Sequence, residues 1–198
     1  MSLKSSADKA LYSVLYVQAL DKNYIDTQDI SQIQRAVDFY KDLDDEYHKM
    51  LSYYYLARIQ ENTKEYSKAI INLLKAEVSA KKINNYFYLG LICRSFSDIY
   101  NNAYNSVESL NYAQKAYEYF QLSGYTNYAD WGLWDIGKAF HNSTDYNSSI
   151  EIGQKVVNIA SVKQDTLLLS DGLRLLATSY VAKKDYTCLL YTSPSPRD

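Results

Sequence analysis

Pairs of a large apolar residue and a small residue recur along the chain every 40 residues, at positions 56, 96, 136 and 176. A large apolar residue followed by a small one occurs at Leu56-Ala57, Phe96-Ser97, Ile136-Gly137 and Leu176-Ala177. Three positions after the small residue stand Gln60, Tyr100, Phe140 and Tyr180, of which three are aromatic. Positions i, i+1 and i+4 share one face of an α-helix. Each segment therefore predicts a helix, and the four helices share one register.

A second helix is predicted after each of these segments. An acidic residue followed by Tyr recurs at multiples of the same spacing in Glu65-Tyr66, Asp145-Tyr146 and Asp185-Tyr186, and the second repeat departs with Asn105-Ser106. An acid at this step caps and favours the N-terminus of the following helix. Small residues then recur on that helix, at Ala69, Ser109 and Ser149 and again at Ala76 and Ala116, and Val156 takes the latter position in the third unit. Neither helix can bury its apolar face alone, so successive pairs are expected to stack.

The predicted fold class is all-α, built from stacked antiparallel helix pairs. Both prolines, Pro194 and Pro196, lie in the last five residues, which suits a chain that is almost wholly helical. Five glycines fall inside predicted helices and are expected to permit close helix packing: Gly90, Gly132, Gly137, Gly153 and Gly172. The predicted helices are 6–22, 30–43, 45–62, 65–82, 84–102, 106–123, 126–142, 146–162 and 165–183.

Two regions of helix pairs are predicted. Residues 6–45 are expected to form a degenerate helix pair, which is either an N-terminal cap or a divergent repeat. A missing repeat upstream of it is a further possibility. Residues 46–187 form the regular array. Its repeats lie near 46–85, 86–125, 126–165 and 166–187, the last of them truncated.

These units resemble the tetratricopeptide repeat (TPR), whose pattern combines Leu-Gly, aromatic residues and Gly-Asp-Tyr with small residues on the second helix. The best matches are Ile136-Gly137, Phe140 and Asp145-Tyr146 in one unit, and Leu56-Ala57, Glu65-Tyr66, Ala69 and Ala76 in another. The resemblance covers roughly residues 46–186 and implies a right-handed α-solenoid. The period exceeds the usual ~34 residues, and no unit has the terminal proline. Forty-residue variants occur among TPR proteins that bind peptides or protein segments, including bacterial peptide-sensing regulators and motor light chains.

The last eleven residues, 188–198, differ abruptly in composition from the rest. The string from Cys188 to Asp198 is similar to the conceptual translation of a transposase adapter used in sequencing libraries. We interpret it as a non-native tail without fixed structure and exclude it from fold reasoning; a natural disordered tail is the alternative. We then expect the natural protein to continue beyond Thr187.

Charge and hydropathy exclude several classes of partner. Lys and Arg total 21 against 23 Asp and Glu, so the net charge of −2 argues against a broad nucleic-acid or membrane-surface binder. No apolar run approaches the ~18 residues of a membrane span. The start, Met1 to Lys9, is polar and lacks the apolar region of a signal peptide. A free cysteine and the lack of a signal peptide favour the cytoplasm, and a longer protein with an anchor or export signal is the alternative.

Catalytic and metal-binding motifs do not occur in the sequence. His48 and His141 are the only histidines and lie in different repeats. No HExxH, paired CxxC, GxSxG or phosphate-binding glycine loop occurs. Cys93 is interpreted as a buried packing thiol, since a reactive thiol needs an electropositive setting. We therefore expect a non-enzymatic protein with no catalytic residue, no metal and no cofactor.

The resemblance implies a concave groove lined by the first helix of each repeat. The aligned positions that would point into it are Tyr54, Arg58, Asn62, Arg94, Asp98, Asn102, Trp134, Lys138, Asn142, Arg174 and Thr178. Each of four successive units offers a cation, which could meet acidic side chains or a terminal carboxylate. The recurring Asn amides could donate to and accept from a peptide backbone, as groove Asn residues do in the TPR family. Trp131 is expected to pack between repeats. The alternative is that the polar residues are only the solvated face of amphipathic helices.

The sequence thus predicts a scaffold that binds a protein or peptide segment, with acidic groups as a possible feature of that ligand. The alternative is a sensor segment of a larger signalling or transcription regulator whose output domain lies beyond Thr187. Self-association through open repeat ends is a further expectation. Neither nucleic acid nor a membrane is expected to bind this segment.

Overall fold

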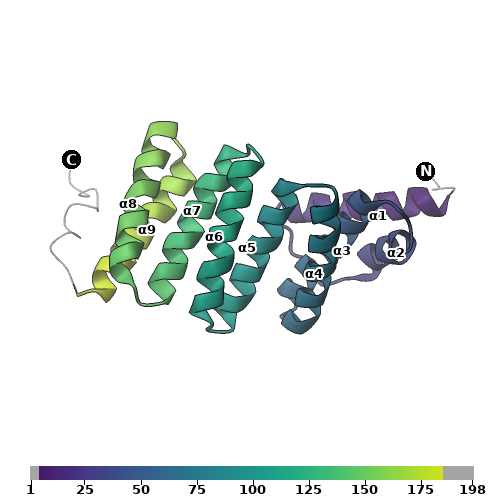
Figure 1. Cartoon of the computed structure of the whole chain (residues 1–198), viewed down its shortest axis with the longest axis horizontal. Coiled ribbons are helices and arrows are strands. Elements are labelled where there is room, and N and C mark those ends of the chain that lie inside the picture. The colour runs from purple at the N-terminus through teal and green to yellow at the C-terminus, as the bar shows by residue number, and fades with distance from the viewer. Residues whose placement is uncertain (1–4, 185–198) are drawn as a thin grey trace. The chain divides into compact units, whose positions relative to one another are not determined.

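The computed structural model describes residues 5–184, and over these residues the chain is α-helical (Figure 1). The helices are α1 (Ser6–Lys22), α2 (Ser31–Tyr40), α3 (Glu46–Asn62), α4 (Tyr66–Lys82), α5 (Tyr86–Asn102), α6 (Ser106–Leu122), α7 (Thr126–Asn142), α8 (Tyr146–Lys163) and α9 (Thr166–Ala182). None of these helices is long and apolar enough to cross a membrane. The tail interpreted as non-native, 188–198, lies outside the described residues.

The helix positions confirm the all-α prediction. Every boundary lies within two residues of its prediction, except that α2 ends at Tyr40 rather than at 43. The first helices of the repeats, α3, α5, α7 and α9, begin at positions 46, 86, 126 and 166, so they follow the period of the sequence motif. α1 begins one period before α3 and has the same length. α1 therefore stands in the register of the regular first helices, while the short α2 departs from it.

The turns recur at half of this period. The turn after each helix from α3 to α9 contains one residue with positive φ, at Lys64, Asn84, Tyr104, Gly124, Thr144, Gln164 and Lys184. Only Gly124 is a glycine. The left-handed region costs a residue with a side chain about 1–2 kcal/mol. Tight turns of constant length thus require this conformation, whatever residue occupies the position.

The acidic residue in the turn between two helices caps the N-terminus of the second helix when its side chain is as short as that of Asp. The Asp145 carboxylate accepts a hydrogen bond from the Ser148 N–H at 3.2 Å, and the Ser148 hydroxyl donates to it at 2.7 Å. These bonds lower the pKa of Asp145, with the hydroxyl bond as the largest cause. Glu65 stands at the same step but makes no capping bond and pairs with Lys68 instead, at 2.9 Å. The predicted cap is confirmed for Asp145 and is wrong for the longer Glu65.

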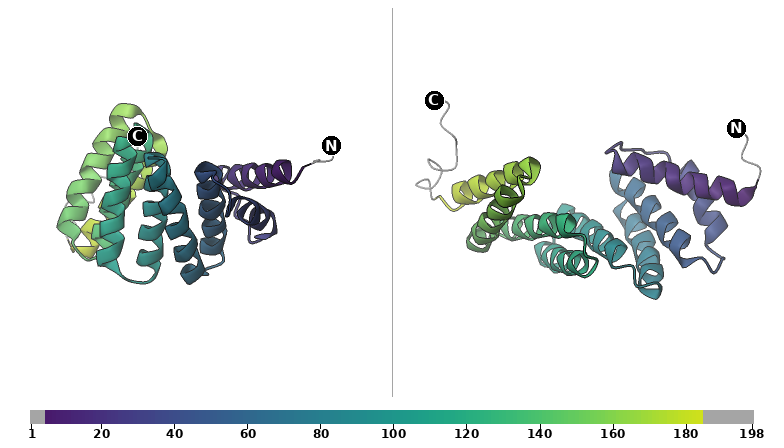
Figure 2. Two further views of the ribbon diagram at one scale, coloured as in Figure 1. Left: turned by 45° about the vertical axis from the view of Figure 1, so that its right-hand side comes forward. Right: turned by 90° about the horizontal axis from the view of Figure 1, so that it is seen from above.

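The described residues form two compact units that divide within α5, at residues 99 and 100. In the first unit α1 packs against α2 and α3, and α3 packs against α4. In the second unit α6 packs against α7, α8 packs against α7 and α9, and α7 also contacts α9. Figure 2 gives two further views of these helices. In each unit, large side chains that are at most 2% exposed form the core, among them Tyr55 and Met50 in the first and Phe120 and Leu168 in the second.

Glycines inside the helices lie where neighbouring helices approach closely. A Cβ atom added at Gly137 on α7 would lie 2.7 Å from Cδ2 of Leu175 on α9. One added at Gly153 on α8 would lie 2.9 Å from Cδ2 of Leu176. The prediction of close helix packing is confirmed for Gly132, Gly137, Gly153 and Gly172, and for Gly90 it stays a prediction.

Candidate functional site

The groove position on α3 is buried in the first unit. Tyr54 is 4% exposed, and its ring makes edge contacts with Tyr55 and Tyr88 at centroid distances of 5.0 and 5.5 Å. Gln18 of α1 donates to the Tyr88 hydroxyl at 3.1 Å, so α1 reaches over α3 to α5. Burial raises the pKa of Tyr54. The structure therefore places Tyr54 in the packed interior and not on a surface open to a ligand.

The cation on α3 is engaged inside the same unit. Arg58 Nε lies 3.2 Å from Oδ1 of Asp21 on α1, and Arg58 Nη1 lies 2.6 Å from Oε2 of Glu61. Burial raises the pKa of Glu61 even though Arg58 opposes this. On α5, Arg94 and Asp98 are half-buried and engaged with other residues. Asn62 is half-buried at the end of α3.

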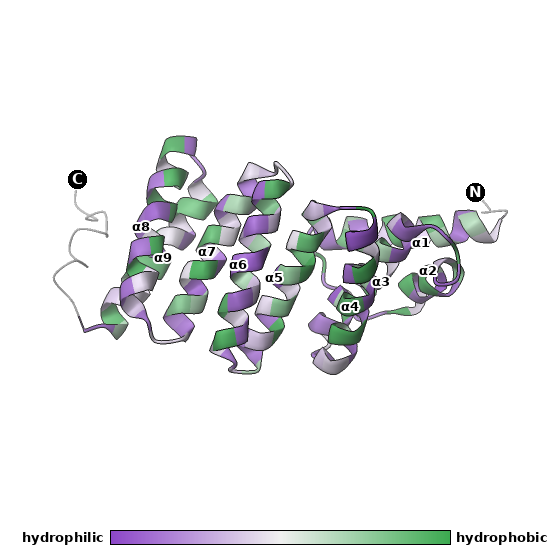
Figure 3. Cartoon of the chain, in the orientation of Figure 1, coloured by the Kyte–Doolittle hydropathy of each residue, from purple (hydrophilic) through white to green (hydrophobic). Residues whose placement is uncertain are grey.

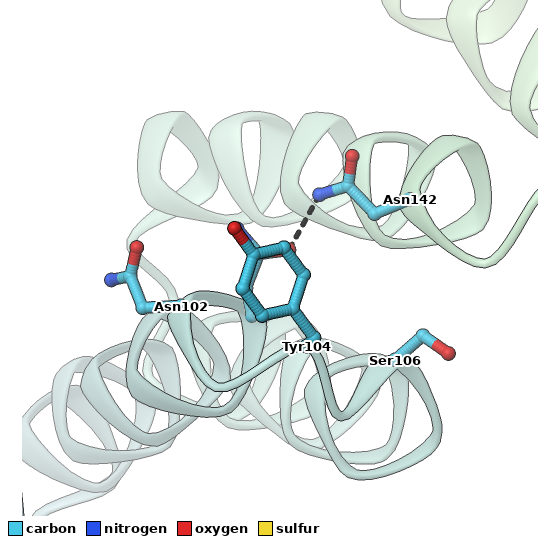
Figure 4. A pocket seen from close by; sticks show the side chains of 5 residues that line it. Asn102, Tyr104, Ser106 and Asn142 are labelled. Atoms are coloured by element: carbon cyan, nitrogen blue, oxygen red, sulfur yellow. Dashed lines mark hydrogen bonds between the residues drawn. The ribbon is translucent and has the colours of Figure 1, made fainter.

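In the second unit the structure brings Asn102 and Asn142 to one pocket of about 370 Å³ (Figure 4). Asn101, Tyr104 and Ser106 complete its lining. The Asn142 amide donates to Oδ1 of Asn101 at 2.6 Å and so joins the ends of α7 and α5. In Figure 4 the Tyr104 ring lies between the Asn102 and Asn142 side chains.

The chemistry of this pocket, which we call the amide pocket, is polar and uncharged. The bond between Asn142 and Asn101 leaves further donor and acceptor sites on both amides, because each amide has two N–H donors and two acceptor lone pairs. Asn102 is exposed. Tyr104 is 96% exposed with φ 58°, an uncommon backbone conformation for a bulky residue. The pocket can offer hydrogen bonds in both directions beside a flat aromatic ring.

The groove-based prediction missed three of these lining residues, namely Asn101, Tyr104 and Ser106. It considered only positions one turn apart on the first helices, whereas Tyr104 lies in the turn that follows α5. A signal was available in the register. Position 104 is equivalent to 64 and 144, which hold Lys64 and Thr144, and it alone of the three presents an aromatic ring.

On α7 and α9, the predicted groove residues Trp134, Lys138 and Arg174 already interact with other residues of the second unit. Trp134 Nε1 donates to the Asp171 carbonyl at 3.2 Å, and Lys138 Nζ lies 4.9 Å from the centre of the Trp134 ring. Lys138 also lies 3.2 Å from Oδ1 of the buried Asp135. Arg174 is paired with Asp171 at 2.7 Å, yet its side chain is 66% exposed. Arg174 is therefore the more accessible of these two cations.

The two tryptophans of α7 both pack against a cluster formed by Val156, Ala160 and Leu168 of α8 and α9. The prediction that Trp131 packs between repeats is confirmed. Trp134 shares this packing and is half-buried, so only part of its ring is accessible.

Thr178 lines a second, mostly apolar hollow of about 290 Å³ near the end of α9. His141, Ala177, Val181 and Ala182 line it with Thr178. His141 Nδ1 lies 2.9 Å from the Ser179 hydroxyl. Thr178 donates to the Arg174 carbonyl at 3.0 Å. Consecutive residues of α7 line the two sites: His141 lines this hollow and Asn142 lines the amide pocket.

Other chemistry on the described residues is limited. Cys93 is 2% exposed, which confirms that it is a buried thiol. Over residues 5–184, no group of three or more His, Cys, Asp or Glu side chains is placed to hold a metal ion.

Comparison with known proteins identifies the fold. No protein-family profile and no curated protein matches the sequence. Among solved structures, the chain is similar to the nearly identical TPR-like repeats of a protein described as a kinesin light chain of Podosopora anserina. The TM-score is 0.72 at 12% identity, over 96% of this chain and 93% of that one. A glutamine-to-methionine variant of those repeats gives 0.71 at 13% identity, with the same coverage. The chain therefore has the α-solenoid fold of TPR-like repeat proteins.

Proposed function

We propose that the chain is a scaffold that holds an extended segment of a partner protein on the first-helix side of its second unit. TPR-like repeat folds serve generally in protein interaction, and such proteins are typically non-enzymatic. The observation that carries the proposal is the amide pocket, where Asn102, Asn142 and Tyr104 line one cavity.

The exposure of the predicted groove residues favours those of the second unit over those of the first. In the first unit Tyr54 is buried and Arg58 is compensated by two carboxylates. In the second unit Asn102, Asn142, Arg174 and Thr178 are exposed. A ligand gains little from groups already satisfied inside the protein, because their existing bonds must first be broken.

The residues of the amide pocket suit a peptide main chain. An extended peptide presents alternating N–H and C=O groups, and an Asn side chain can pair with both. The exposed Tyr104 ring offers a rigid surface for an apolar side chain of the ligand at low entropy cost. Arg174 could exchange Asp171 for a ligand carboxylate, since an exposed ion pair contributes only about 0–1 kcal/mol. The preferred ligand is thus an extended segment with one apolar and one acidic side chain.

The test uses peptides selected from a random dodecapeptide display library on the immobilised chain. The dissociation constant of a selected peptide is measured for the unmodified chain and for Asn102→Ala, Tyr104→Ala and Asn142→Ala. Each change is expected to weaken binding about tenfold, which corresponds to one lost hydrogen bond or ring contact. Asn147→Ala is the matched control, because Asn147 is exposed on α8 outside the pocket. Equal binding by all variants would refute the proposed site.

A further inference from the structure

The outer face of α1 carries large apolar residues, three of them at positions that are buried in every later repeat. Tyr16 is 43% exposed. Its equivalents in the successive repeats are all between 1% and 6% exposed, namely Leu56, Phe96, Ile136 and Leu176. Leu15 is 52% exposed, whereas its equivalents are between 2% and 6% exposed, namely Tyr55, Ser95, Asp135 and Leu175.

Tyr12 follows the same rule. It is 49% exposed, while its equivalents Ser52 and Ile92 have no exposed surface and the next two are buried glycines, Gly132 and Gly172. Leu11, beside it, is 39% exposed. The Tyr12 and Tyr16 rings stack at a centroid distance of 5.9 Å. We call Leu11, Tyr12, Leu15 and Tyr16 the α1 face; Figure 3 shows the hydropathy along α1.

In the second unit the equivalent face is covered by the second helix of the preceding repeat. A Cβ added at Gly132 on α7 would lie 3.2 Å from the Tyr117 backbone on α6. One added at Gly172 on α9 would lie 3.0 and 3.1 Å from Val157 and Val156 on α8. The repeat geometry thus places a helix on this face. Over the described residues, no helix precedes α1 to cover it.

We propose that the α1 face is a homodimer interface, on which α1 of a second copy packs in antiparallel orientation. The sequence of the face is self-complementary about Leu15. Asp8 lies seven residues before Leu15 and Lys22 seven residues after it, so a two-fold axis at Leu15 sets each Asp8 opposite Lys22 of the partner subunit. The same axis sets Leu11 opposite the small Ala19 of the partner subunit.

The charges at the ends of α1 are available for these contacts. Asp8 and Lys22 are exposed, and neither forms an ion pair within the described part of the chain. The Asp8 carboxylate accepts one hydrogen bond, from the Ser5 N–H at 3.3 Å, and keeps further acceptor sites. Seven-residue spacing keeps Asp8, Leu15 and Lys22 on one side of a helix, as in a coiled coil. A parallel arrangement would instead set like charges against each other at both ends. This proposal is independent of the proposed function, because it involves a different helix and a different unit.

A single helix pair is smaller than a standard interface, so the dimer is expected to dissociate at a concentration on the order of 10 μM. Sedimentation equilibrium of the chain, from about 1 to 200 μM, is expected to show a monomer of 22.8 kDa in reversible exchange with a dimer. Leu15→Glu is expected to raise the dissociation constant at least tenfold, because it sets two carboxylates together at the axis. Val107→Glu is the matched control, since Val107 is 75% exposed on α6 and lies outside the α1 face.

Exchanging the charges of Asp8 and Lys22 distinguishes the antiparallel homodimer from any other contact made by the α1 face. Asp8→Lys and Lys22→Glu are each expected to weaken the dimer about tenfold, because each sets like charges opposite one another twice per dimer. The double variant is expected to restore most of the affinity. Circular dichroism of each variant checks that α1 remains helical.

Three outcomes would overturn the proposal. The first is a monomer throughout this concentration range. The second is a dimer that withstands Leu15→Glu, which would place the contact elsewhere. The third is a double variant no tighter than the single ones, which would exclude the antiparallel register. Selected peptides could still bind the amide pocket in each case, so the failure of this proposal and that of the proposed function are distinguishable.

Discussion

Nη1 of Arg58 lies 2.6 Å from Oε2 of Glu61, one turn further along α3. The same guanidinium reaches Asp21 on α1 through its Nε atom, at 3.2 Å. Arg58 is therefore a structural cation that joins α1 to α3. The sequence predicts a groove residue at this position, whereas in the structure Arg58 joins two helices of the first unit.

Removal of this cation should destabilise the first unit. We expect Arg58→Ala to lower the free energy of unfolding by about 3 kcal/mol, because Asp21 and the mostly buried Glu61 would remain close together without compensation. Urea denaturation followed by circular dichroism measures the change. Arg174→Ala provides the comparison. Since Arg174 is 66% exposed, its loss should change stability by no more than about 0.5 kcal/mol. Similar effects of the two changes would contradict a structural role of Arg58.

Substitutions at turn residues with positive φ test the turn geometry through the free energy of unfolding. Thr144 has φ 66°, and a β-branched residue is strained in that region. We expect Thr144→Gly to raise the unfolding free energy by about 0.5–1 kcal/mol, since the relieved strain exceeds the added chain entropy of glycine.

Gly124→Ala should lower the unfolding free energy by about 1 kcal/mol. Gly124 has φ 74°, and no atom lies within 4 Å of an added Cβ, so any loss reports the backbone alone. A destabilising Thr144→Gly would count against the turn geometry.

The ion pair between the start of α3 and the end of α4 predicts a pH dependence of stability. The hydrogen bond from Lys82, at 2.8 Å, is the largest cause that lowers the pKa of Glu46 from 4.5 to about 2, and Ser79 and Lys49 add to it. Because the folded-state pKa lies below the unfolded one, the ionised Glu46 stabilises the protein above about pH 4.5. This stabilisation is lost as the pH falls toward 2.

Glu46→Gln tests this dependence. It should cost about 1 kcal/mol of unfolding free energy near pH 7, and the difference from the unmodified chain should shrink below pH 4. Unfolding by urea at a series of pH values measures both quantities. Glu65→Gln is the control, because its pair with Lys68 is more exposed and should contribute less. A difference that stays constant from pH 7 to pH 3 would contradict the assigned role of Glu46.

The helix positions were predictable because the repeat determines them locally. Pairs such as Ile136-Gly137 mark the first helix, and the constant turns fix its length, so α7 and the other first helices begin within two residues of their predictions. The end of α2 was not predictable in this way, because residues 6–45 carry no copy of the repeat motif.

The state of the groove residues was harder to predict, because it depends on contacts between distant segments. The fate of Arg58 depends on Asp21, 37 residues earlier, and the burial of Tyr54 depends on α1 reaching over α3. The helical face of a residue follows from its register, but its exposure depends on the neighbouring repeat. Tyr104 was missed because a turn residue lies outside the helical pattern, although its equivalents share its left-handed backbone.

The most direct test of the binding role is the NMR response of the side-chain amides when a library-selected peptide is added to the chain. The proposed site predicts that the amide signals of Asn101, Asn102 and Asn142 shift together as the peptide saturates the protein. The signals of Asn147 and Asn158, which lie on α8 outside the pocket, should stay in place. Shifts of these α8 amides, with the pocket amides unmoved at saturation, would contradict the account.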